Sequence, residues 1–153
     1  MNFISALCSN PYLLSCLCAW LTAQTVKTVI HAVIHKKLEI RRLFGDGGMP
    51  SGHTATVTAL AATCGLNAGF DSAVFAVSAI LTVVVCRDAV GVRRETEKQA
   101  KLLNKVVDTL NTDEKAPLSD EPLNIFIGHT PLQIAVGALI GIGVAVILHF
   151  LVL

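Results

Sequence analysis

The sequence predicts an all-α integral membrane protein, a polytopic helical bundle with about four spanning helices plus an amphipathic cytoplasmic helix. Of the 153 residues, 53% are hydrophobic and only 15% are charged, whereas a soluble domain carries about 25% charged residues. The mean hydropathy is +0.64. The apolar runs are long and continuous, which favours helices over strands that alternate between two faces. We therefore expect a single integral membrane domain over residues 1–153.

Four stretches approach the length of about 20 mostly apolar residues that a spanning helix needs. They cover about 11–34, 54–70, 72–92 and 131–153. The two in the middle are short and polar at one end. Because residues 1–20 have no basic region, we expect the first stretch to remain as a helix and not to be removed as a signal peptide.

The lysine and arginine residues set the expected orientation. None of the twelve precedes Lys27, none lies between Arg42 and Arg87, and none follows Lys115. Two predicted spans separate the two basic clusters, so both clusters lie on the same face of the membrane, and the positive-inside rule makes that face cytoplasmic. Both termini would then lie outside, and the protein would reside in the cell membrane (the inner or plasma membrane).

The longest polar segment, 93–128, is expected to hold a cytoplasmic helix followed by a flexible loop. A helix in its first half would place four apolar residues on one side, namely Leu103, Val106, Val107 and Leu110. Such a helix is suited to the membrane surface. The loop covers 111–122, which is rich in Asp, Glu, Pro and Ser.

Two glycine pairs have the spacing of close helix packing: Gly65 with Gly69, and Gly137 with Gly141. We interpret them as contacts inside one bundle and leave a homo-oligomer open. The five cysteines all fall in apolar stretches, which indicates small buried hydrophobic side chains and not disulfides or zinc ligands.

Three polar segments meet at the predicted cytoplasmic face. GGMPSGHT (47–54) precedes the second span, DAVGVRR (88–94) ends the third, and GHTP (128–131) opens the fourth. Two histidines, His53 and His129, therefore stand where helices begin, and helix N-termini are anion sites because their N–H groups are free. Together with Lys27, Arg93 and Arg94 they predict a phosphate cradle that contains two imidazoles.

Each piece also has a simpler interpretation. The glycines and proline before His53 can form an ordinary turn, Lys27 can be a lysine at the end of a span, and Arg93 and Arg94 can be orientation charges. His31 and His35 have the i, i+4 spacing of a metal pair, but two histidines alone are too few ligands for a typical metal site. We expect no metal and no cofactor. A net charge of +1 and 5% aromatic residues argue against a nucleic-acid partner.

The segments GGMPSGHTATVTAL, DAVGVRR followed by QAKLLNK, and GHTP resemble the divergent branch of the type 2 phosphatidic acid phosphatase family. The resemblance runs over nearly the whole chain. It implies that His129 is the nucleophile and His53 the general acid, with phosphate contacts from Ser51 and Gly52. In the wider superfamily an arginine precedes the nucleophile by six residues, where this chain has Leu123, so Arg93 or Arg94 would have to serve from another helix end.

The residue four positions after His129 is Gln133, where the wider superfamily has Asp and the divergent branch usually Glu. A glutamine can orient the imidazole through its amide oxygen, but it brings no charge to stabilise an imidazolium. In a serine protease triad the comparable Asp to Asn change costs about ten thousand-fold in rate.

We therefore predict a phosphatase-like membrane protein that hydrolyses or transfers phosphate from a lipid or a small phosphomonoester. The alternative is a weakly active or inactive member that binds or moves a phosphorylated lipid, and a third interpretation is a purely structural membrane protein. The expected partners are phosphate or a phosphorylated lipid, together with membrane lipid.

Overall fold

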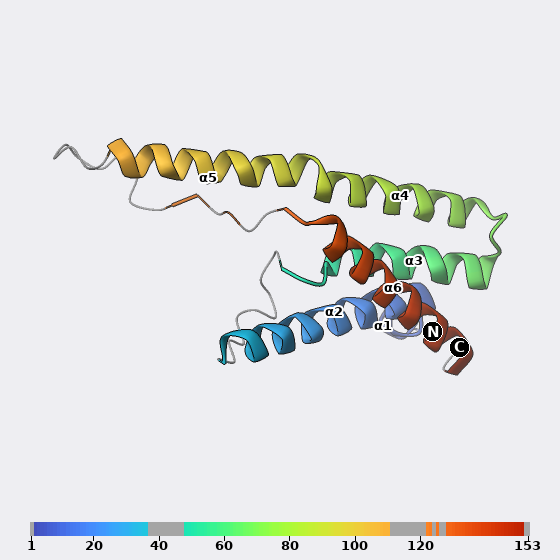
Figure 1. Cartoon of the computed structure of the whole chain (residues 1–153). Helices are drawn as coiled ribbons and strands as arrows, with labels where there is room; N and C mark the ends of the chain where they lie inside the picture. Colours follow the sequence, from blue (N-terminus) through green and yellow to red (C-terminus); the bar gives the residue numbers. More distant parts are fainter. Residues whose placement is uncertain (1, 37–47, 111–121, 124, 126–127, 152–153) are drawn as a thin grey trace.

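The apolar stretches form helices in the computed structural model, which describes residues 2–36, 48–110, 122–123, 125 and 128–151. The helices of this part are α1 (Phe3–Cys8), α2 (Pro11–His35), α3 (Gly52–Ala68), α4 (Ala73–Val90), α5 (Val92–Leu110) and α6 (Pro131–Leu151) (Figure 1). The described part contains no strand, in agreement with the all-α prediction. The predicted flexible loop lies outside the described residues except for Pro122.

Short polar residues begin most of the long helices. The side chain of Asn10 accepts hydrogen bonds from two backbone N–H groups of α2, and Pro11 follows it at the first helical position. Ser51 caps α3 and Ser72 caps α4 in the same way. These residues satisfy N–H groups that have no partner inside a helix, so each start is fixed locally by the sequence.

The helix α3 lies at the centre of the bundle and packs against α2, α4 and α6. Its buried face is lined by small residues: Ala55 and Ala59 are fully buried together with Ala19 and Ala23 of α2. Small side chains let helix axes approach closely, which gives many weak dispersion contacts per turn.

The glycine pair on α6 serves this packing. A Cβ atom added at Gly137 would lie 2.6 Å from the carbonyl oxygen of Ser51, and one at Gly141 would collide with α3 at Ala55 and Thr58. The interpretation of this pair as a contact inside the bundle is confirmed. The other pair acts differently: the ring of Phe70 packs on Gly65, and Gly69 ends α3 with a φ of 91°.

Three of the helical segments described by the structure are long and apolar enough to cross a membrane: Pro11–His35, Ala73–Leu110 and Pro131–Leu151. Of the four spans expected, the described residues thus provide three. The remaining predicted span corresponds to α3, whose 17 residues reach about 25 Å at 1.5 Å per residue. That is shorter than a hydrocarbon core of about 30 Å. Because α3 packs against α2, α4 and α6, lipid cannot surround it on all sides.

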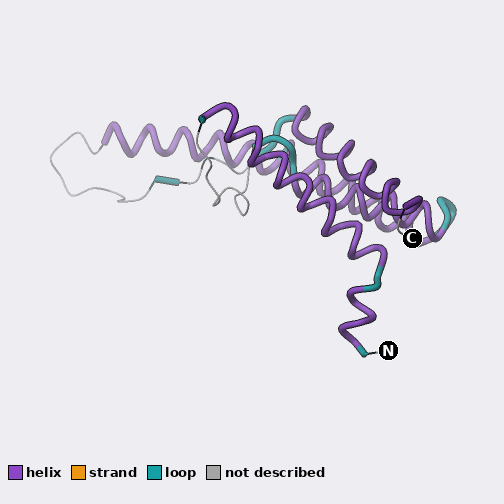
Figure 2. Tube along the Cα trace, turned by 90° about the horizontal axis from the view of Figure 1, so that it is seen from below, coloured by secondary structure: helices purple, strands orange, loops and turns teal. Residues whose placement is uncertain are grey.

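The amphipathic helix predicted after the third span is present as α5, but it does not turn along the end of the bundle. In Figures 1 and 2 it continues α4 and projects beyond the other helices. Hydrogen bonds cross the junction, because Gly91 N donates to Arg87 O at 2.9 Å and Glu95 N donates to Gly91 O at 3.0 Å. The helical ladder therefore continues through Gly91, and Leu103, Val106 and Leu110 of α5 remain exposed.

The cysteine interpretation is correct only in part. Cys64 is buried, whereas Cys16, Cys18 and Cys86 are partly buried and Cys8 is exposed. All five are free thiols. Cys8 belongs to α1, a short helix that packs only lightly on α2, which is why its side chain finds no cover.

One end of the bundle gathers the polar segments. The C-terminal ends of α2 and α4 and the N-terminal ends of α3 and α6 lie toward this end, while the turn between α3 and α4 and the C-terminus of α6 lie toward the other (Figure 1). This antiparallel order is what the charge pattern predicts.

Candidate functional site

A pocket of about 240 Å³ opens at this end of the bundle. Three elements and the turn before α6 line it, through His53, Val84, Val85, Asp88, Ala89, Arg93 and His129. Residues from all three polar segments thus meet around one space, although 76 positions separate the two histidines in the sequence. The convergence that the sequence predicts is present.

Two backbone hydrogen bonds hold these segments together. His129 N donates to Ala89 O, near the end of α4, at 3.1 Å. Ser51 N, just before α3, donates to Gln133 O, in the first turn of α6, also at 3.1 Å. The starts of α3 and α6 and the end of α4 are therefore joined through main-chain atoms, whose positions do not depend on side-chain rotamers.

The start of α6 is a reciprocal capping arrangement. Thr130 Oγ1 accepts from Gln133 N at 3.4 Å, and Gln133 Oε1 accepts from Thr130 N at 2.9 Å. This is the capping box, in which a Thr and a Gln three residues later satisfy each other's backbone N–H groups. Gln133 therefore has a structural role in addition to the orienting role that the resemblance implies.

The same oxygen fixes the tautomer of His129. A backbone N–H can only donate, so the atom of Gln133 that faces Thr130 N is the oxygen and not the amide nitrogen. This oxygen also lies 3.2 Å from Nδ1 of His129. Nδ1 must then carry the hydrogen, which leaves the lone pair on Nε2.

Burial keeps His129 neutral. The residue is only 5% exposed, and this burial lowers the pKa of its imidazole below the ordinary value. The hydrogen bond to Gln133 opposes the shift, while Lys27, His53 and Arg93 add to it as neighbouring positive or ionisable groups. The imidazole is thus held in the form that can act as a nucleophile.

The predicted phosphate contacts of Ser51 and Gly52 lie at the start of α3. Ser51 is fully buried, and its Oγ accepts from Thr54 N at 3.4 Å and from Thr54 Oγ1 at 3.0 Å. Gly52 is packed so that an added Cβ would stand 3.5 Å from the ring of Trp20. The acceptor lone pairs of the Ser51 oxygen are therefore occupied as a helix cap, and the donors that this start of α3 offers to an anion are the Ser51 O–H and the N–H groups of the first turn.

Lys27 lies inside the bundle and not at its surface. It is 7% exposed, and the middle of its side chain lies 3.8 Å from where a Cβ of Gly48 would stand. Gly48 has a φ of 83°, a conformation that favours glycine. A lysine that reaches out to water at a membrane surface would be exposed, so the simpler interpretation of Lys27 is wrong.

The structure separates the two arginines. Arg93 lines the pocket and pairs with Asp88, with 2.5 Å between Nε and Oδ2. Arg94 does not line the pocket, and its backbone lies against Gly128, where an added Cβ would stand 2.7 Å from the Arg94 Cα. Arg93 is therefore the better candidate for a phosphate contact.

Asp88 is a pocket residue that sequence reasoning did not select. Its carboxylate is five residues before Arg93, and the continuous helix through Gly91 brings the two side chains together. A signal was present in the sequence, since an acid and a base flank the same glycine at the end of a span.

No metal cluster of three or more His, Cys, Asp or Glu side chains occurs among the described residues. The rings of His31 and His35 stack on each other, with 4.1 Å between their centroids.

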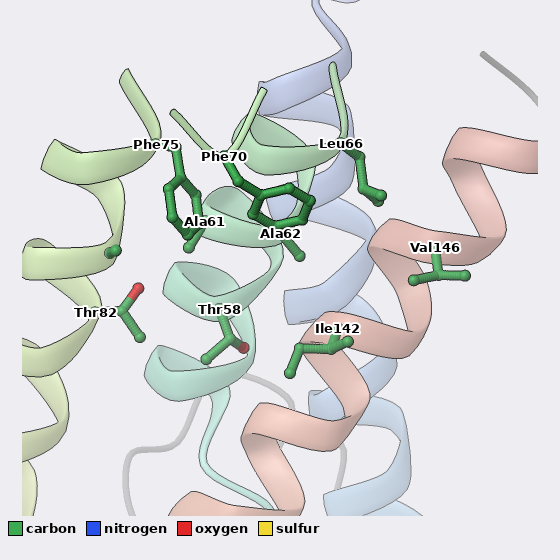
Figure 3. A pocket seen from close by; sticks show the side chains of 10 residues that line it. Thr58, Ala61, Ala62, Leu66, Phe70, Phe75, Thr82, Ile142 and Val146 are labelled. Atoms are coloured by element: carbon green, nitrogen blue, oxygen red, sulfur yellow. The ribbon is translucent and has the colours of Figure 1, made fainter. Parts of the chain in front are cut away.

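A second hollow, of about 400 Å³, is lined almost entirely by apolar atoms and lies between α3, α4 and α6 (Figure 3). Thr58 and Thr82 stand in one part of it, and the rings of Phe70 and Phe75 stand in another. The two rings meet edge to face with 5.1 Å between their centroids. This hollow offers no ionisable side chain and is distinct from the pocket with the histidines.

Comparison with known proteins agrees with these observations. The sequence model of the divergent PAP2 family matches residues 8–144. The uncharacterized membrane protein YuiD of Bacillus subtilis (strain 168) is 38% identical in an alignment that covers 94% of this chain and 97% of that protein. No solved structure matches the chain.

Proposed function

Because the chain belongs to the divergent PAP2 family, we propose that it is a membrane-embedded phosphatase-like protein that hydrolyses or transfers phosphate from a lipid or a small phosphomonoester. One observation carries the proposal. His129 stands in a pocket with a second histidine and an arginine, and its contact with Gln133 leaves the Nε2 lone pair for phosphorus.

The chemistry assigns a role to each side chain. His129 Nε2 attacks phosphorus while the bond to the leaving oxygen breaks, and His53 gives a proton to that oxygen. Water then attacks the phosphohistidine and gives a proton back to His53, the bond between phosphorus and Nε2 breaks, and phosphate is released. Arg93, Lys27 and the free N–H groups at the start of α3 stabilise the charge on the equatorial oxygens.

We propose further that this end of the bundle faces the cytoplasm and that α3 is a fourth membrane-inserted helix. The basic residues of α5 and the predicted basic cluster between α2 and α3 support that orientation, although most of the second cluster lies outside the described residues. A pocket at the headgroup level of a membrane favours a lipid phosphate as substrate.

A binding protein without turnover is the second candidate. Gln133 is neutral, so it cannot stabilise an imidazolium at His129 by charge, and Asp88 already engages Arg93 in the pocket. Both observations favour slow catalysis over fast catalysis. A member of this kind would bind or move a phosphorylated lipid.

The test is phosphate release by the purified protein in detergent, from a panel of lipid phosphates and soluble phosphomonoesters. We expect release by the wild type and none by His129→Ala. We also expect Arg93→Ala to impair release more than Arg94→Ala does, because only Arg93 lines the pocket. Equal and slow release by the wild type and His129→Ala would overturn the enzymatic proposal and leave the binding protein.

A further inference from the structure

The residues that lead into α6 are held by polar side chains of α5. Asn104 pairs with the backbone of Leu123 in both directions: its Nδ2 donates to Leu123 O at 3.0 Å, and its Oδ1 accepts from Leu123 N at 2.9 Å. The side-chain amide thus satisfies both the backbone N–H and the backbone carbonyl of Leu123. The contact spans 19 positions in the sequence, so it fixes the return of the chain and not a local turn.

A second contact lies closer to the pocket. Glu97 Oε2 accepts from Gly128 N at 3.3 Å, and its other oxygen accepts from Lys101 Nζ. Glu97 therefore accepts through both carboxylate oxygens, one from α5 itself and one from the residue before His129. Gly128 approaches the backbone of α5 so closely that a side chain there would collide with Arg94.

These contacts share one face of α5 with the pocket. Arg93, Glu97, Ala100 and Asn104 follow one another at spacings of four, three and four residues, which places them in one stripe. Ala100 is only 6% exposed, although most of α5 is exposed. This burial is expected where another segment covers the helix. Leu103, Val106 and Leu110, which are exposed, lie outside this stripe.

The backbone of His129 itself has a single partner in α4, the carbonyl oxygen of Ala89. Its position therefore depends on α6 on one side, through Gln133, and on the preceding residues on the other. The preceding residue is Gly128, which Glu97 holds.

We propose that α5 is a positioning arm for His129, in which Asn104 and Glu97 hold the chain before α6 and thereby set where the imidazole stands in the pocket. The inference rests on the proposed function, since an exact imidazole position matters for attack on phosphorus. Neither residue touches the pocket, so both are positioning residues. A misplacement of about 1 Å costs as much as about 100-fold in rate.

The experiment uses the full chain in detergent with isotope-labelled histidine. The pH titration of the ring signals gives the pKa of His129, and phosphate release gives kcat and KM. In Asn104→Ala and Glu97→Ala we expect the pKa of His129 to rise toward about 6.5, because a looser segment admits water to the ring, and kcat to fall more than KM changes.

Two further variants serve as controls. Glu95→Ala removes an exposed ion pair with Lys98 on the same helix. This pair makes no contact with the described residues before α6, and we expect the variant to match the wild type. Glu97→Gln keeps an acceptor for Gly128 N and should restore most of what Glu97→Ala loses. The charged and ionisable groups that act on His129, namely Lys27, His53 and Arg93, are unchanged in every variant.

The titration separates this inference from the proposed function. If the wild type releases no phosphate, the proposed function fails, while the pKa of His129 still reports whether α5 positions the ring. An unchanged pKa of His129 in both Asn104→Ala and Glu97→Ala overturns the inference. So does an equal effect of Glu95→Ala, or a common shift of all the histidines, because either result would indicate general loosening of the fold.

Discussion

At the scale of single residues, Gln133 has the largest effect on the geometry and charge around His129. It closes the capping box with Thr130 and holds Nδ1 of His129 through the same oxygen. A glutamate would make both contacts and add a negative charge next to the imidazole. One side chain therefore both caps α6 and orients the imidazole of His129. The neutral amide keeps this geometry but brings no charge to the site.

Replacing this amide by a carboxylate tests that interpretation. We expect Gln133→Glu to leave thermal stability about unchanged, because a glutamate serves the same capping box, and to raise the pKa of His129. Phosphate release should rise by about tenfold or more, since the reverse change in a serine protease triad costs about ten thousand-fold. Release that falls while stability is retained would contradict the orienting role.

Burial of His129 predicts a dependence of stability on pH. Its pKa is lower in the folded protein than in the unfolded chain, so the unfolded chain binds a proton that the folded protein does not. The contribution of the neutral ring is complete above pH about 6.5 and is lost as the pH falls from there through the folded-state pKa. Thermal unfolding of wild type and His129→Asn at several pH values measures this. The variant should lose less stability on acidification, and parallel curves would contradict the prediction.

The sequence predicts the members of the site better than their contacts. His53, Arg93 and His129 were identifiable because helix-start residues and a basic pair stand at span ends, and span order brings those ends together. Asp88 and the occupied oxygen of Ser51 were not, because side-chain pairing depends on rotamers and on how deeply a helix end is buried. The separation of Arg93 from Arg94 depends on the rotation of α5, which a charge pattern does not contain.

At the scale of elements, the contact between α3 and α6 holds the bundle together. It depends on two glycines that let α6 approach the backbone of α3 around Ala55. The same contact brings the first turns of both helices into register, since Ser51 N donates to Gln133 O at its end. Helix packing and the shape of the pocket are therefore set by one interface.

A matched pair of glycine substitutions on α6 tests this interface. Gly141→Ala places a methyl group against Thr58 and Ala55, whereas Gly143→Ala meets nothing within 4 Å. We expect Gly141→Ala to lower the free energy of unfolding in detergent by about 1–3 kcal/mol, as overpacking does, and Gly143→Ala to leave it unchanged or slightly raised. Equal effects would show that close packing at Gly141 contributes little.

The helix boundaries were largely predictable, but the direction of α5 was not. Caps and glycines mark where α2, α3, α4 and α6 begin or end. The sequence does not indicate that the helix continues through Gly91, because a glycine commonly ends a helix with a positive φ. Here the φ of Gly91 is −96°, and the helix continues. Periodicity identified the amphipathic face of α5 without indicating that α5 prolongs α4.

At the scale of the whole molecule, the antiparallel order of the helices places the polar residues of the candidate site at one end of the bundle. Both histidines and Arg93 line the pocket at that end, and Lys27 lies beside Gly48 and acts on His129 through its charge. The apolar hollow of Figure 3 lies elsewhere between the helices. The number of spans is the part that hydropathy alone left uncertain, because α3 is short and is sheltered by its neighbours.

Labelling from outside the cell tests the orientation. In a chain with its native cysteines replaced, we expect Asp71→Cys, in the turn between α3 and α4, to react with an impermeant thiol reagent. Lys105→Cys, on α5, should react only after the membrane is opened, since basic residues stay on the cytoplasmic side. The reverse pattern would place the pocket on the outer face and contradict the proposed orientation.

The central claim is that His53, Arg93 and His129 form one anion site, and vanadate binding tests it most directly. Vanadate adopts the trigonal-bipyramidal geometry of phosphoryl transfer, so a catalytic site should bind it more tightly than phosphate. At a hundredfold excess over its Kd, a single-site ligand raises the free energy of unfolding by about 2.7 kcal/mol. We predict a saturable thermal shift in detergent that is larger for vanadate than for phosphate at equal concentration and is lost in His129→Ala and Arg93→Ala. No shift at saturating vanadate, or the same shift in the wild type and both variants, would contradict the shared site.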